Sequence, residues 1–149
     1  MELSPWLWFL HTLPESLALA SLAIVFCNRK ISAGSIFFVG AVYAVAVYLV
    51  RLLPFTAFGI HFVILVFVLG MLLYYTLKAR FSLSLLCSFG ALTVLAALEM
   101  LCMYLLSILT GIPVQEAVEN LWMHLLFAWP HVLFIFLLGW FLNQRWKFD

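Results

Sequence analysis

The stretch Arg51-Leu-Leu-Pro-Phe-Thr-Ala-Phe-Gly-Ile-His61 separates two long apolar runs, residues 33–50 and 62–77. It contains an arginine, a proline that stops helices, a flexible glycine and a histidine. A charged side chain at the edge of a membrane-spanning segment is energetically costly, so by default it marks a functional site. We therefore interpret this stretch as the rim of a polar pocket in an otherwise lipid-soluble protein.

The composition around this stretch is that of a membrane protein. Of the 149 residues, 68% are hydrophobic and only 9% are charged, whereas soluble domains carry about 25% charged residues. The length predicts one domain, residues 1–149. The net charge of +1 says nothing about nucleic acid, but no basic cluster of the right kind is present, so we predict the lipid bilayer and no nucleic acid as a partner.

A helix needs about 20 apolar residues to cross the hydrocarbon core of a bilayer. Because backbone polar groups in lipid must be satisfied within the segment, such runs form helices. The sequence thus predicts an all-α polytopic protein with five transmembrane helices, at residues 6–27, 33–53, 59–77, 82–109 and 121–142. A short interfacial helix is expected at 114–120, where apolar residues recur at helical spacing.

The basic residues predict the orientation of the chain. One side of the membrane receives six of the seven, and only Arg51 falls on the other. The positive-inside rule then places the N-terminus outside and the C-terminus in the cytoplasm of a multi-pass plasma (bacterial inner) membrane protein. The basic residues assigned to the cytoplasmic side are Arg29, Lys30, Lys78, Arg80, Arg145 and Lys147.

Small residues four apart allow helices to approach closely. Gly40 with Ala44, and Ser84 with Ser88, are such pairs, and they could serve packing within the chain or a homodimer seam. The three cysteines lie inside apolar runs without CxxC spacing, which predicts buried thiols instead of disulfides or zinc ligands.

The ionisable residues within the apolar segments all fall in the outer half or at the midplane. Arg51 and Glu99 match best in depth, and we predict a salt bridge between them, structural or part of a ligand site. Glu15, after the helix-disturbing Pro14, could be a second partner of Arg51 or a lone protonated acid. The candidate ligand-binding residues are Arg51, Glu99, His61, Glu15 and His131.

Four histidines on one side also raise the alternative of a metal or haem site. His61 and His124 could face each other at similar depth. No HxxxH or HExxH pair is present, so we predict neither a metal nor another cofactor. A cysteine protease is disfavoured too, because no activating motif surrounds Cys102. The sequence therefore predicts no enzyme.

Several short motifs are spread along nearly the whole chain: Arg51-x-x-Pro54, Phe58-Gly-Ile-His61, Glu99, Leu109-Thr-Gly111-Ile, Glu116 and Pro130-His131. Together they resemble the N-terminal five-helix membrane module of Firmicute-type GHKL sensor histidine kinases. That resemblance implies a sensor that passes a signal through its last helix to a cytoplasmic kinase. Because the sequence stops at Asp149, it implies a stand-alone or truncated module that lacks the kinase domain.

The leading hypothesis is a non-enzymatic membrane sensor that binds a small or peptidic extracytoplasmic ligand and acts on a cytoplasmic signalling partner or as a homo-oligomer. A transporter or channel subunit, gated at Pro14 and Pro130, is the second hypothesis. A small structural or assembly protein of the membrane is the third. A structure that places Arg51 and Glu99 separates these readings best.

Overall fold

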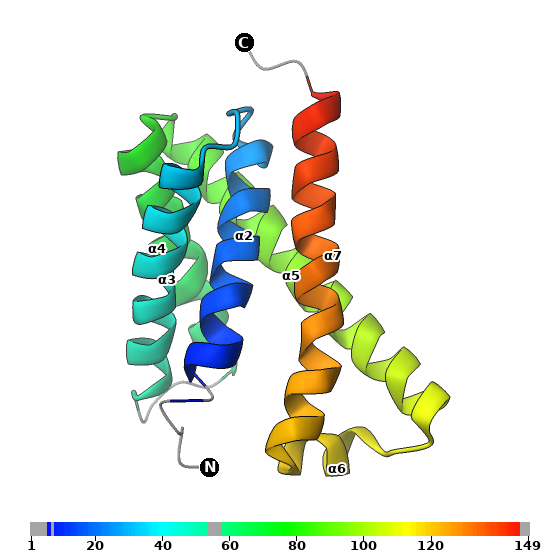
Figure 1. The fold of residues 1–149 in the computed structure, drawn as a ribbon. Helices are drawn as coiled ribbons and strands as arrows, with labels where there is room; N and C mark the ends of the chain where they lie inside the picture. Colours follow the sequence, from blue (N-terminus) through cyan, green and yellow to red (C-terminus); the bar gives the residue numbers. More distant parts are fainter. Residues whose placement is uncertain (1–5, 7, 54–57, 147–149) are drawn as a thin grey trace.

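A computed structural model describes residues 6, 8–53 and 58–146 of the chain. Those residues form helices and connections, with no strand among them. Figure 1 shows the helices side by side in one bundle. The elements are η1 (Trp8–Thr12), α2 (Leu13–Phe26), α3 (Ala33–Arg51), α4 (Phe58–Leu77), α5 (Phe81–Thr110), α6 (Val114–Glu119) and α7 (Leu121–Arg145).

Five of the described helical segments are long and apolar enough to cross a bilayer. Large apolar side chains cover much of the bundle's outer surface, among them Leu86 and Leu109, at 67% and 79% exposure. That surface suits lipid and not water, so the chain is a multi-pass membrane protein with the predicted all-α fold. The end of α7 lies at the opposite end of the bundle from the start of α2 (Figure 1). Which end faces the cytoplasm stays a prediction.

The shortest of these spans is Phe9–Phe26, and α2, which makes up most of it, forms the centre of the bundle. It contacts α3, α4, α5 and α7, and every residue from Ala18 to Val25 is buried. Small side chains on α2 and its neighbours make this close packing feasible. Gly40 of α3 lies so near α2 that an added Cβ would stand 2.9 Å from the Leu17 Cα, and an added Cβ at Gly139 of α7 would stand 3.0 Å from the Ser21 hydroxyl.

The small-residue pairs predicted from the sequence serve contacts within the chain. Gly40 contacts α2, as described above, and the Ser88 hydroxyl of α5 donates a 2.6 Å hydrogen bond to the Val66 carbonyl of α4. Ser84 is fully buried. All three cysteines are free and buried, as the sequence indicates.

The first predicted helix is two segments, a π-helical turn at Trp8–Thr12 and the α-helix Leu13–Phe26. Pro14 stands at the start of the α-helix. A proline has no N–H to donate and its ring crowds the carbonyl four residues before it, so a wider turn at this point removes both problems. Residues 54–57, which include Pro54 of the stretch between Arg51 and His61, lie outside the described residues.

The longest helix, α5, crosses the bundle obliquely. It packs along α4 and also contacts α2 and α7. Its later half runs away from α3 and α4 (Figure 1). The helix ends at Gly111, whose φ of 70° is the left-handed conformation that glycine adopts without strain. The predicted interfacial helix follows as α6, and α7 then returns across the whole bundle.

Candidate functional site

Arg51 is the last residue of α3, and the course of this helix determines where its side chain lies. The Ser32 hydroxyl begins the helix by accepting a hydrogen bond from the Ser35 N–H, at 3.2 Å. From there Tyr43, Val47 and Arg51 follow at intervals of four residues, so one face of α3 presents all three. That face is directed into the bundle, where all three side chains line the same cavity.

The larger cavity, which we call the outer hollow, has a volume of about 470 Å³. It lies where α5 separates from α3 and α4, the divergence visible in Figure 1. Three ionisable side chains, Arg51, His61 and Glu99, share it with five apolar side chains. Each ionisable group comes from a different helix. The apolar side chains are Phe62, Leu65, Leu92, Leu95 and Ala96.

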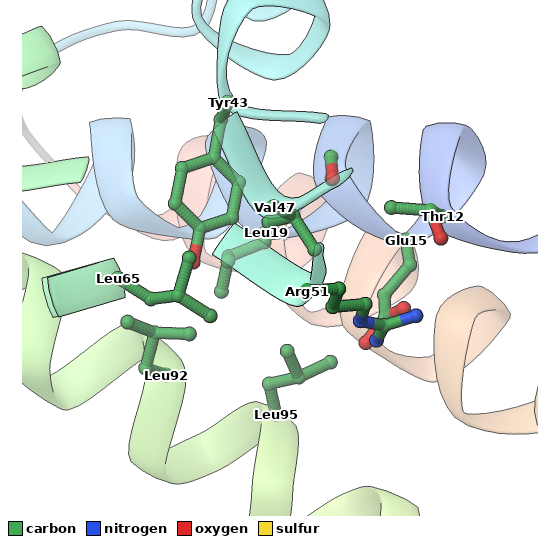
Figure 2. Close-up of a pocket in the computed structure, with 10 residues that line it drawn as sticks. Thr12, Glu15, Leu19, Tyr43, Val47, Arg51, Leu65, Leu92 and Leu95 are labelled. Atoms are coloured by element: carbon green, nitrogen blue, oxygen red, sulfur yellow. The ribbon is translucent and has the colours of Figure 1, made fainter. Parts of the chain in front are cut away.

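A second cavity of about 60 Å³, the inner chamber, lies behind Arg51 (Figure 2). Its polar lining comes from Thr12, Glu15, Ser16, Tyr43 and Arg51. Arg51 lines both cavities, together with Leu65, Leu92 and Leu95, so its side chain stands at their shared wall. The remaining apolar lining residues are Leu19 and Val47.

Three polar residues of the chamber, Thr12, Ser16 and Tyr43, are not among the site residues predicted from the sequence, and Tyr43 is the largest of them. Its side chain is 2% exposed, and its hydroxyl has no hydrogen-bond partner among the described residues. Figure 2 shows the hydroxyl pointing away from α3 toward the leucines of α4 and α5. The signal in the sequence was its spacing of eight residues from Arg51, which puts both side chains on one helical face.

The predicted salt bridge between Arg51 and Glu99 is absent. The one side-chain pair within salt-bridge distance in the described part of the chain is His11 Nδ1 and Glu15 Oε2, 3.6 Å apart across the junction of η1 and α2, and it is an ion pair only when His11 is protonated. Arg51 and Glu99 line the same hollow but do not contact each other across it, because α5 leans away from the end of α3 (Figure 1). Glu15 lines the inner chamber together with Arg51 (Figure 2), and its predicted role as a second partner of Arg51 stays a prediction.

His131 lies apart from both cavities. It is fully buried in α7, and neither ring nitrogen has a hydrogen-bond partner among the described residues. Its ring centroid lies 6.3 Å from that of His11, and the ring centroid of His124 lies 5.1 Å from that of His11. We call His11, His124 and His131 the histidine cluster.

The histidine cluster does not make a metal centre. No group of three histidine, cysteine, aspartate or glutamate residues in the described ranges is arranged to hold a metal ion. His61 lines the outer hollow on α4, whereas His124 packs against His11. The structure therefore gives the alternative of a haem held by His61 and His124 no support.

The site thus joins four of the five predicted ligand-binding residues around two adjoining cavities. His61, Glu99 and Arg51 line the outer hollow, and Glu15 reaches Arg51 from the inner chamber. Chemically, the arrangement offers a cation, a carboxylate and an imidazole beside an apolar wall. Comparison with known families, with curated proteins and with solved structures finds no match for this chain.

Proposed function

We propose that this chain is a non-enzymatic sensor of the plasma membrane that binds a small or peptidic extracytoplasmic ligand in the outer hollow and signals through α7. One observation carries the proposal: Arg51, His61 and Glu99, from three different helices, line one cavity of about 470 Å³. Small-molecule sites have volumes of about 300–1,000 Å³ and combine apolar walls with a few convergent polar groups.

The energetics of the bilayer support a functional role for these residues. Ionisable side chains within transmembrane segments are costly and occur mainly where they face an interior or a cavity that serves binding or transport. If Arg51 and Glu99 had a purely structural role, we would expect their side chains to form a salt bridge with each other. Arg51 and Glu99 instead leave an open volume between two helices, which a ligand could fill.

The packing supplies a route from the hollow to α7. Four of the eight lining residues belong to α5, and α5 also packs against α7. At the far end of α7, the Asn143 Oδ1 accepts a 3.0 Å hydrogen bond from the Ile31 N–H of the α2–α3 connection. A ligand that binds one tilt of α5 more tightly than another would shift α7 with it, because a ligand acts only through its differential affinity for two states.

The resemblance to the membrane module of GHKL sensor kinases fits this proposal, since that module passes its signal through its last helix. On this view α7, with Arg145 in its last turn, contacts a cytoplasmic signalling partner or a second copy of the chain. The homodimer in this proposal would form outside the Gly40 and Ser88 contacts, which are occupied within one chain.

A ligand screen tests the proposal on the purified full chain in detergent. The probes are a set of zwitterionic tripeptides and a set of short-chain amphiphiles, and the readout is the thermal unfolding midpoint from tryptophan fluorescence. At least one probe should raise the midpoint of the wild type and not that of Arg51→Gln. Arg145→Gln, at the other end of the bundle, is the matched control and should respond as the wild type does. Equal responses in all three proteins, or none in the wild type, would refute the proposal.

The inner chamber favours one alternative, a transporter subunit, because it extends the polar lining from the hollow into the bundle. Beyond Tyr43 the chamber is walled by leucines from α2, α4 and α5, which offer no lining for an ion. A proton-flux assay in proteoliposomes separates the two functions. The sensor predicts no flux above empty vesicles, whereas flux abolished by Glu15→Gln would favour the transporter.

A further inference from the structure

The outer hollow contains an acid without a partner. Glu99 is half-buried and makes no hydrogen bond or ion pair with any residue that the structure describes. Its electrostatic neighbours are Glu15, His11 and Arg51, so two carboxylates share one guanidinium. A carboxylate in such a place is satisfied most directly by a cationic group brought in by a ligand.

The same hollow contains an arginine that makes no ion pair within 4.0 Å among the described residues. Arg51 is exposed and has five N–H donors in a fixed fork, which suits phosphate and carboxylate. Glu15 interacts with it from the chamber side, and His61 lines the hollow beside it as a further hydrogen-bonding group. One wall of the hollow therefore offers a cation, and α5 offers an anion.

The rest of the lining of the hollow is apolar and comes from α4 and α5, which also carry apolar side chains on the outer surface of the bundle. Five of its eight lining side chains are apolar. Next to the lining residues of α4 and α5 stand apolar side chains that the bundle leaves more than half exposed. They are Ile60 and Val63 beside His61 and Phe62, and Met100 and Leu101 beside Glu99. A ligand that reaches the hollow from the side would meet hydrocarbon on its way and along one wall.

We propose that the ligand of the outer hollow is a zwitterionic amphiphile drawn from the bilayer, with its anionic group on Arg51, its amine on Glu99 and an acyl chain along the apolar wall. This inference rests on the proposed function, because it names the ligand class of the same site. Phosphoethanolamine lipids have this combination of a phosphate, a primary amine and acyl chains.

Titrations of the purified full chain with short-chain lipids test the inference. The probes are phosphatidylethanolamine, phosphatidylglycerol, a cationic trimethylammonium lipid and free O-phosphoethanolamine, followed by tryptophan fluorescence. The wild type should bind phosphatidylethanolamine about tenfold more tightly than either singly charged lipid, since a charged hydrogen bond contributes about 1.5–3 kcal/mol and 1.4 kcal/mol is tenfold in affinity. It should bind the free head group more weakly than the lipid.

Two variants test the contributions of the Glu99 and Arg51 charges to lipid binding separately. Glu99→Gln should lose the preference for phosphatidylethanolamine but still bind phosphatidylglycerol, which also shows that the protein is folded. Arg51→Gln should lose phosphatidylglycerol and retain the cationic lipid. Glu116→Gln, an exposed acid on α6, is the matched control and should leave every affinity unchanged.

The outcomes distinguish this inference from the proposed function. Equal affinity of the wild type for all three lipids, free phosphoethanolamine binding as tightly as the lipid, or equal losses for all probes in both variants would overturn the amphiphile inference alone. Binding of tripeptides but of no lipid would do the same. If no probe of either kind binds, the sensor proposal fails as well.

Discussion

At the scale of single residues, the site shows what depth alone can and cannot predict. Arg51 and Glu99 were matched by depth from the sequence, and they do share a cavity. The predicted salt bridge did not form, because depth says nothing about the angle of α5, which holds the two side chains apart. Tyr43 is one aromatic residue in an apolar run, so the sequence does not single it out. Its spacing of eight residues from Arg51 nevertheless indicates that both side chains lie on one face of the helix.

Tyr43→Phe tests whether the inner chamber is hydrated. A buried water molecule needs a cavity of about 10–15 Å³ and two to four polar partners. The inner chamber has a volume of about 60 Å³, and Glu15 and Arg51 line it together with Tyr43. We expect the Tyr43 hydroxyl to bind water there, so the substitution should lower the free energy of unfolding by about 1 kcal/mol. The measurement is reversible unfolding in mixed micelles. Unchanged or greater stability would mean that the chamber is dry.

His131→Leu tests the place of this histidine. Replacing a buried polar group that has no partner by an apolar one of similar size is neutral or stabilising, and His131 lies outside both cavities. We expect the stability to be unchanged or raised, and the ligand-induced shift of the unfolding midpoint to be that of the wild type. A lost ligand response in a stable variant would restore His131 to the binding site.

At the scale of the helices, the sequence predicted the segments well and their geometry poorly. The predicted bounds of the second, third and fourth spans differ from the structure by at most two residues, because apolar runs end at polar ones. Helix α7 continues three residues further, through Asn143, Gln144 and Arg145, since polar residues can extend a helix beyond the hydrocarbon. The π-turn before Pro14 and the tilt of α5 depend on backbone crowding and side-chain packing, which hydropathy does not record.

Gly40→Ala tests the closest helix contact. A Cβ there would stand 2.7 Å from Leu17 Cδ2 and 2.9 Å from the Leu17 backbone, so α2 and α3 must separate. Overpacking of this kind costs about 1–3 kcal/mol. Gly34→Ala is the control, because nothing lies within 4 Å of its Cβ, and alanine gains about 0.5–1 kcal/mol over glycine within a helix. Equal effects of the two substitutions on the unfolding free energy would contradict this packing.

At the scale of the whole molecule, the orientation is the largest prediction that the fold leaves open. An exposed cysteine at Gln115→Cys on α6 should react with a membrane-impermeant maleimide added to intact cells. One at Gln144→Cys, near the end of α7, should react only after the membrane is opened. The reason is the cytoplasmic preference of basic residues, which gather at the α7 end of the bundle. The reverse pattern would place the outer hollow on the cytoplasmic side.

The proposed function requires the outer hollow to be a solvent-accessible, outward-facing site. Ala96 lines it on α5, and Leu86, on the same helix, is exposed on the bundle's outer surface without lining either cavity. The direct measurement is labelling of Ala96→Cys and Leu86→Cys in intact cells by a charged thiosulfonate, with Cys27, Cys87 and Cys102 replaced by alanine. We predict that Ala96→Cys is modified from outside and Leu86→Cys is not. Protection of Ala96→Cys, or its modification only from the cytoplasmic side, would contradict the account.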